Sequence, residues 1–216
     1  MRLYLVRHGQ TSWNVEQRAQ GHTDIPLDEE GIRQADMLGH SFAGVGIDRV
    51  LSSDLKRSVQ TAEQMAEYVE TALKDQANGT ALPFVQIEKT TGRVIGSTRY
   101  ANIDRRHHRV EIGWSWIGQP WQRTVVNTES KYLLLRHAFE TLGCMRVELK
   151  TDSLNAKSRA AILRIGAREE GTFRKHMITS NGRIRHTVYF SIVDAEWPEV
   201  RSRLELKLGQ SSFSKA

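Results

Sequence analysis

One long amphipathic helix, expected over residues 56–76, divides the pattern of this sequence in two. Its apolar residues, from Val59 to Leu73, keep the spacing of three and four that places them on one helix face. Asn78-Gly79 predicts its end. Before this helix the sequence predicts a strand over 2–6, a helix over 28–42 and a strand over 48–52. After it, turns containing glycine join successive strands, so two kinds of folding unit are expected in one chain.

The second part has the pattern of a mixed α/β sheet with covering helices. Residues 209–216 are predicted to be a disordered tail. Strands are predicted over 82–88, 93–100, 109–117, 145–151, 168–178 and 184–193, and helices over 128–142, 155–165 and 197–208.

The composition excludes several classes of protein. No apolar run approaches the roughly 20 residues of a membrane span, and no signal-peptide pattern is present at the beginning, so a cytoplasmic protein without membrane contacts is expected. The single cysteine rules out an intramolecular disulfide. The net charge of +6 favours anionic partners. Its basic residues are dispersed, however, so nucleic acid is not an expected partner.

Three separated motifs occur in order in the first part of the chain: LYLVRHGQTSWN (3–14), QGHTD (20–24) and SSDLKRSVQTA (52–62). Together they resemble the histidine phosphatase (phosphoglycerate mutase) superfamily. The resemblance implies that His8 would accept a phosphoryl group and that Arg7 and Arg57 would clamp it. It stops near residue 65, and the second histidine motif of the family does not follow. Arg7, His8 and Arg57 are therefore expected to be vestigial.

Residues from about 69 to 208 resemble the GNAT superfamily of acetyl-CoA-dependent N-acetyltransferases, and are most similar to its RimJ/RimL branch. The resemblance rests on residues 94–104, 109–176 and 194–204. It implies a GNAT-like mixed sheet whose missing N-terminal elements are replaced by a βαβα phosphatase-like fragment. The expected organisation is a chimera: a fragment over 1–68, a GNAT-like domain over 69–208 and a tail over 209–216.

The resemblance places acetyl-CoA, and no metal, at the strand, loop and helix of residues 111–142. The backbone N–H groups at a helix N-terminus favour a pyrophosphate there. The family loop carries two glycine or glycine/alanine positions, whereas residues 122–127 read QRTVVN. The bulky Val125 disfavours a positive φ angle, which puts coenzyme A affinity in question. The implied cofactor residues are Trp116, Ile117, Gln122, Arg123, Thr124, Val125, Val126, Asn127, Asn155 and Arg159.

Two positions are implied to carry the chemistry of acetyl transfer. Glu111 would take the proton of an acceptor ammonium, with a solvated or ion-paired strand carboxylate as the alternative. Ser158 would return a proton to the departing thiolate. Asn155 would bond the pantetheine arm, or would simply cap its helix. Arg123 and Arg159 would meet phosphates of coenzyme A, or would only solubilise the surface.

The predicted function is acetyl transfer to a primary amine. The expected acceptor is a small polycation such as an aminoglycoside antibiotic, which implies a resistance enzyme; carboxylates that only cap and solubilise the first helix are the alternative. Rival functions are a protein N-terminal acetyltransferase, a vestigial histidine phosphatase and a catalytically inactive binding module. The sequence also allows a homodimer. Expected acceptor residues are Asp24, Asp28, Glu29, Glu30, Asp104 and Trp114. Of the remaining candidates, His107-His108 is expected to be a loop pair and Cys144 a small buried hydrophobe.

Overall fold

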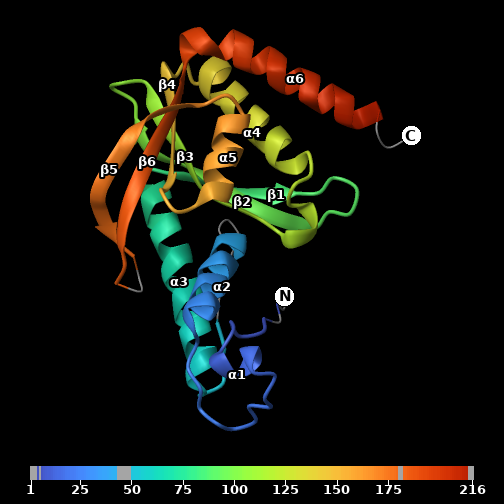
Figure 1. Cartoon of the computed structure of the whole chain (residues 1–216), viewed down its shortest axis with the longest axis vertical. Helices are drawn as coiled ribbons and strands as arrows, with labels where there is room; N and C mark the ends of the chain where they lie inside the picture. Colours follow the sequence, from blue (N-terminus) through green and yellow to red (C-terminus); the bar gives the residue numbers. More distant parts are fainter. Residues whose placement is uncertain (1–3, 5, 43–49, 180–181, 214–216) are drawn as a thin grey trace. The chain divides into compact units, whose positions relative to one another are not determined.

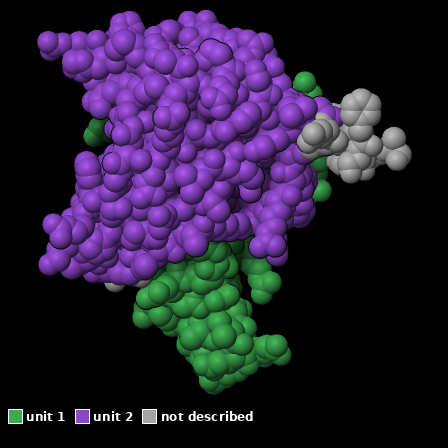
Figure 2. All heavy atoms as spheres, turned by 45° about the horizontal axis from the view of Figure 1, so that its top comes forward, with its two compact units in different colours: residues 1–78, 83–97 green, residues 79–82, 98–216 purple. Residues whose placement is uncertain are grey.

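The structure is a computed structural model that describes residues 4, 6–42, 50–179 and 182–213 (Figure 1). The chain divides into two compact units, coloured separately in Figure 2. The first unit comprises residues 1–78 and 83–97, and the second comprises residues 79–82 and 98–216.

In the first unit, the described part of residues 1–78 contains three helices: α1 (Ser12–Val15), α2 (Glu29–Phe42) and α3 (Lys56–Ala77). The apolar faces of α2 and α3 pack through Phe42, Met65 and Val69. The backbone of Gly39 lies so close to α3 that a Cβ atom there would be 2.8 Å from the Cβ of Tyr68. α3 ends at Ala77 with Asn78 as its C-cap, where the sequence predicts the end of the helix.

The two strands predicted for this fragment are not formed in its described residues. Tyr4, Val6 and residues 50–52 have no regular secondary structure, and the remainder of both predictions falls outside the described residues. A strand needs a neighbour to satisfy its backbone N–H and C=O groups. All six strands of the described chain begin after residue 81, so the short apolar runs of the fragment have no such neighbour.

The sheet has six strands: β1 (Leu82–Ile87), β2 (Val94–Asp104), β3 (Arg109–Ile117), β4 (Arg146–Asp152), β5 (Arg168–Ile178) and β6 (Ile184–Val193). Their spatial order is β1-β2-β3-β4-β6-β5. β3 and β4 are parallel, whereas β6 pairs antiparallel with β4 and β5. This mixed sheet confirms the predicted fold class.

Strands β4 and β6 separate an apolar face from a polar one, because successive side chains of a strand point to opposite faces. Val147 and Leu149 of β4 and Val188, Phe190 and Ile192 of β6 are at most 2% exposed and form the core. The intervening residues are Glu148, Lys150 and Asp152 on β4 and Thr187, Tyr189 and Ser191 on β6.

Three helices accompany the sheet: α4 (Val126–Arg136), α5 (Ala156–Arg164) and α6 (Trp197–Phe213). A π turn over His137–Thr141 continues α4. The predicted tail from residue 209 is wrong as far as Phe213, because α6 runs to that residue. A single glycine costs a helix only about 1 kcal/mol and no proline follows it, so Gly209 does not end the helix.

Candidate active site

The loop between β3 and α4 is held by its own side chains. Gln122 donates from Nε2 to the carbonyl oxygen of Ile117 at 2.8 Å. The hydroxyl of Thr124 donates to the carbonyl oxygen of Trp121 at 2.6 Å and accepts from the N–H of Val126 at 3.3 Å. The loop therefore delivers the chain into α4 in a fixed geometry.

Backbone angles show how this loop forms without glycine. Its left-handed residue is Arg123, with a φ of 62°. Val125 has a φ of −67° and a ψ of −19°, which are ordinary right-handed helical values. A branched side chain is compatible with those angles, so Val125 does not strain the turn. The first N–H groups of α4 lack intrahelical acceptors, as at every helix start, and suit an anion such as a pyrophosphate.

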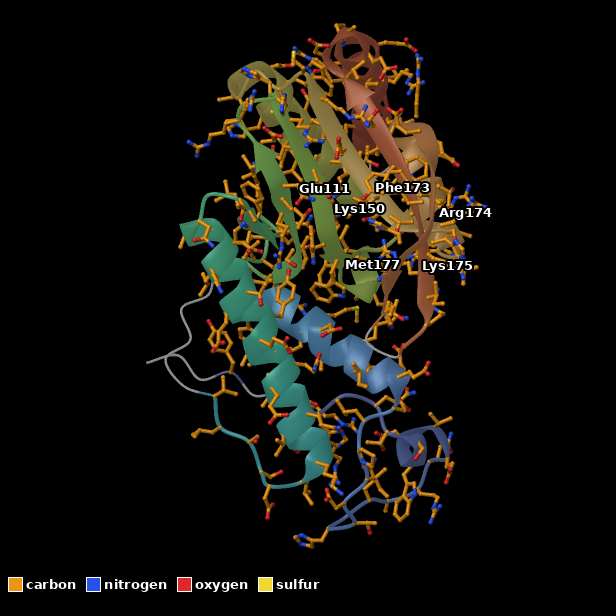
Figure 3. The ribbon with its side chains drawn as sticks, turned by 90° about the vertical axis from the view of Figure 1, so that its left-hand side faces the viewer. Glu111, Lys150, Phe173, Arg174, Lys175 and Met177 are labelled. Carbon is orange, nitrogen blue, oxygen red and sulfur yellow. The ribbon has the colours of Figure 1, made fainter. Side chains whose placement is uncertain are left out.

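Glu111 is buried on β3, with its side chain only 3% exposed. Its Oε2 atom lies 2.9 Å from the Lys150 ammonium and accepts from Asn102 Nδ2 at 2.7 Å. The ring centroids of Trp114 and Tyr189 lie 5.7 Å and 6.0 Å from the same ammonium. Figure 3 labels Glu111 and Lys150 on the sheet. Glu111 is thus an ion-paired strand carboxylate here, and its role as a base stays a prediction.

Trp114 sits at an irregular point of β3. Its φ is 47°, in the left-handed region, and its side chain is exposed beside the guanidinium of Arg99, 4.8 Å from the ring centroid. Trp116 and Trp121 are half-buried. The aromatic ring that the sequence places in the acceptor site is therefore accessible.

A buried lysine, Lys131, is the feature that sequence reasoning missed. Its ammonium donates to the hydroxyl of Ser115 and, at 3.4 Å, to that of Thr98, and the two hydroxyls lie 2.8 Å apart. Burial disfavours its charged form and lowers the pKa of Lys131 to about 7. Its spacing to Leu134, Leu135 and Ala138 matches one helix face and was the available signal.

The helix after β4 places the second group of predicted cofactor residues. Asn155 caps α5, because its Oδ1 accepts from the N–H of Ser158 at 2.9 Å. Arg159 forms an ion pair with Glu169 at 3.1 Å. Lys157 donates to the Oε1 atom of Gln122, so the start of α5 contacts the loop before α4.

Most of the predicted acceptor carboxylates have cations of this chain as partners. Asp28 instead caps α2, since its Oδ1 accepts from the N–H of Gly31 at 2.8 Å. Glu29 is exposed. Hydrogen bonds, first from the N–H of His107 and then from Arg109, hold the pKa of Asp104 below its usual value. The ion pairs are Asp24 with Lys56, Glu30 with Arg33, Asp104 with Arg109 and Glu111 with Lys150.

The phosphatase-like motif has internal structural partners. Arg57 is 6% exposed and donates to the carbonyl oxygens of Thr23 and Gly21, both at 2.9 Å. The Nδ1 atom of His8 lies 2.7 Å from the carbonyl oxygen of Gly9. Arg7 is exposed. Arg57 therefore fixes the loop that the family motif uses, with two of its guanidinium nitrogens engaged.

The remaining candidates are a cysteine and a pair of histidines. Cys144 is buried, as expected, and burial raises the pKa of its thiol. His107 and His108 lie in the turn between β2 and β3, which confirms the loop pair. Within the described ranges, no group of three or more His, Cys, Asp or Glu side chains could hold a metal ion. The helices of those ranges are too short or too polar to cross a bilayer.

Comparison with known proteins finds two families in this one chain. The model of the histidine phosphatase superfamily (branch 1) matches residues 3–130. A probable acetyltransferase of the GNAT family from Chromobacterium violaceum is 30% identical, with a TM-score of 0.56, over 81% of this chain and 88% of that chain. The chain belongs to both families. This result confirms the predicted chimera.

Further relatives of both kinds are similar to this chain. A GCN5-related N-acetyltransferase from Brucella melitensis is 29% identical, with a TM-score of 0.62, over 79% of this chain and 75% of that chain. The probable phosphoglycerate mutases GpmB of Proteus mirabilis and Cronobacter sakazakii are 48% and 46% identical over 67 residues. That segment is 31% of this chain and 31% of each mutase, so the chain spans less than a third of these curated relatives.

Proposed function

We propose that this GNAT-type chain transfers the acetyl group of acetyl-CoA to a primary amine. The observation that carries the proposal is the turn before α4, which presents the first N–H groups of the helix without needing glycine at Val125. The GNAT fold supplies the context. Mycobacterium smegmatis RimJ, which shares the fold at 19% identity and a TM-score of 0.61, was solved with CoA-disulfide.

The residues of this chain divide the work of the reaction. The N–H groups at the start of α4 hold the pyrophosphate, with the exposed Arg123 beside them. Backbone N–H groups near Trp116 and Ile117 polarise the thioester carbonyl. Glu111 accepts a proton from the acceptor ammonium, and Ser158 protonates the departing thiolate. The amine nitrogen bonds to the carbonyl carbon as the carbon–sulfur bond breaks, and its second proton replaces the one that Ser158 gives to the thiolate, so no covalent enzyme intermediate forms.

The first experiment measures acetyl-CoA binding by calorimetric titration, and free thiol release with a panel of amines. Asn127→Asp places a negative charge in the first turn of α4 and should weaken acetyl-CoA binding about tenfold. Asn78→Asp, the same change at the end of α3, is the matched control. A protein that binds no acetyl-CoA is a binding module of another kind, and the transferase proposal is then wrong.

One candidate for the acceptor is a polycation such as an aminoglycoside, with a role in resistance, and this candidate rests on the acidic residues. Glu29 is exposed and offers its charge to solvent, whereas three carboxylates of the set, Asp24, Glu30 and Asp104, already have cationic partners. A Glu29→Lys/Glu30→Lys double variant should raise the KM of an aminoglycoside and leave that of a neutral amine unchanged. Equal effects on both amines would remove the polycation assignment.

Protein N-terminal acetylation is the other acceptor class. A structure described as a 'putative ribosomal-protein-serine acetyltransferase' from Vibrio cholerae shares the fold at 20% identity, which supports the fold alone. Peptides with free N-termini belong in the amine panel for this reason.

We place the boundary between the two family segments inside α3, near residue 69, and the protein in the cytoplasm.

Phosphatase activity is the alternative from the first family. Arg57 has two nitrogens engaged with backbone carbonyls, so it is not free to clamp a phosphate without releasing the loop. We expect no hydrolysis of a phosphomonoester above the level of a His8→Ala variant. Hydrolysis that depends on His8 would restore this alternative.

A further inference from the structure

A hollow of about 710 Å³ opens on the hairpin of β5 and β6. Its lining residues are Phe173, Arg174, Lys175, His176 and His186. Figure 3 labels the first three, along with Met177, on the ribbon of β5. None of these five residues carries a carboxylate, and no predicted site residue is among them.

A bulge in β5 produces the hollow. Phe173 pairs with Thr187 and Met177 pairs with Arg185, so residues 174–176 lie opposite His186 alone. Lys175 has a φ of 51°, which takes the strand out of its regular alternation. A bulge bends its strand and re-aims the side chains that it carries. Here it gathers two permanently basic side chains and a histidine around a second histidine.

The hydrogen-bond pattern of His186 gives the hollow a defined chemistry. The N–H of Lys175 donates to His186 Nδ1 at 3.3 Å, so the proton of the neutral ring is on Nε2. His186 can thus donate, together with the guanidinium of Arg174 and the ammonium of Lys175. The side chains of Arg174 and Lys175 only donate hydrogen bonds and carry positive charge, so they suit an anion with several oxygen acceptors.

Aromatic contacts connect this hollow with Glu111. The ring of Phe173 lies 4.5 Å from that of Tyr189 between centroids, and the ring of His176 lies 5.8 Å from it. Tyr189 pairs with Lys150 across β4 and β6, and Lys150 holds Glu111 at 2.9 Å. The hollow therefore adjoins the polar face of β4 and β6 that leads to the predicted base.

We propose that this hollow binds a phosphate or carboxylate carried by the amine acceptor, so that the acceptor is an anionic amine and not a polycation. The proposal rests on acetyl transfer as the proposed function and names its substrate class. The exposed ring of Phe173 covers the apolar stem between the two ends of such a molecule. The same basic side chains repel a polycation, because like charges raise the energy of binding.

Calorimetric titration with O-phosphoethanolamine, β-alanine and ethanolamine tests the hollow directly. These amines differ in the group at the far end: a phosphate, a carboxylate or a neutral hydroxyl. We expect at least one of the anionic amines to bind about tenfold more tightly than ethanolamine, because one charge-assisted contact contributes about that much to the affinity. About 0.5 M salt should reduce this difference because it screens the charges. The better of the two identifies the natural anion.

Arg174→Ala/Lys175→Ala should abolish the preference without changing the melting temperature greatly, since both side chains are exposed. Arg105→Ala/Arg106→Ala removes the same charge from the exposed turn between β2 and β3 and is the matched control. Loss of the preference in both double variants would indicate a general charge effect and overturn the proposal.

The thiol-release assay with the same amines separates the two proposals. Acetylation with no preference for an anionic amine, or with a preference for an aminoglycoside, refutes the anion site and leaves acetyl transfer standing. Absence of acetylation with every amine refutes the acetyl-transfer function. Binding that favours the anionic amines and depends on Arg174 and Lys175 then still supports the anion site.

Discussion

Lys131 offers a test of the interior of the GNAT domain that does not depend on any substrate. The pKa of this buried amine is lowered to about 7, whereas the pKa of a lysine in an unfolded chain is about 10.4, as in model peptides. Between these values the unfolded chain holds a proton that the folded chain has lost. Stability must therefore rise with pH in this window.

The size of the effect follows from linkage. A full proton of difference changes the free energy of unfolding by about 1.4 kcal/mol per pH unit. At pH 7 the folded amine is still half protonated, so the gain between pH 7 and pH 9 is roughly 2 kcal/mol. With a urea slope of about 2 kcal/mol/M, the midpoint of unfolding should rise by about 1 M.

The measurement compares urea unfolding of the parent protein and of Lys131→Met at pH 7, 8 and 9. Methionine keeps the length of the side chain and removes the titrating group. Between pH 7 and pH 9 the urea midpoint of the variant should therefore rise by about 1 M less than that of the parent. Lys89→Met, at an exposed lysine in the turn after β1, is the control and should follow the parent. Parallel pH profiles for Lys131→Met and the parent would show that the amine is not buried as described.

Three further outcomes are expected from the described contacts. Glu111→Gln should lower kcat at least about tenfold with a smaller change in KM if the carboxylate takes the proton, and an unchanged kcat assigns the proton to another group. Gly9→Ala should lower the free energy of unfolding by about 2 kcal/mol, because the new Cβ would lie 2.3 Å from the carbonyl oxygen of Gly31. Gly209→Ala, in open space on α6, is the control and should not lower it. Equal melting temperatures of the two variants would contradict the close approach at Gly9. Arg123→Gly should raise stability by up to about 1 kcal/mol, since glycine accepts a φ of 62° without a Cβ clash, and a loss of stability in thermal unfolding would argue against that conformation.

The elements of this fold were predictable where one face of a helix or strand is buried. The helix expected over 56–76 is observed over Lys56–Ala77. It was predictable because both of its signals, the apolar spacing and Asn78-Gly79, lie within the helix or directly after it. The alternation along β4 likewise marks its buried residues correctly. The strands expected at 2–6 and 48–52 failed in their described part because a strand depends on a neighbour that local sequence does not contain.

The site was harder to predict because its partners are distant in the sequence. Nothing near Glu111 indicates that Lys150 neutralises it. By residue type alone, Lys131 would be predicted to be exposed. Only its spacing to Leu134 and Leu135 of α4 indicates that it lies on the buried face of that helix. The bulge over residues 174–176 has no periodic signature, so the gathering of basic side chains around His186 becomes visible only in the paired strands.

The division of labour between the two faces of β4 and β6 bears on how such an enzyme can diversify. Val147, Leu149 and their neighbours form the packed core, while Tyr189, which adjoins the proposed hollow, occupies an alternate position of the same strands. Replacing Tyr189 leaves the packed side chains untouched, whereas replacing Lys150 removes the ion-pair partner of the buried Glu111. New acceptor preferences are therefore accessible by single substitutions, and a library that varies Tyr189 but keeps Lys150 and the buried Thr187 and Ser191 should retain a high proportion of folded members.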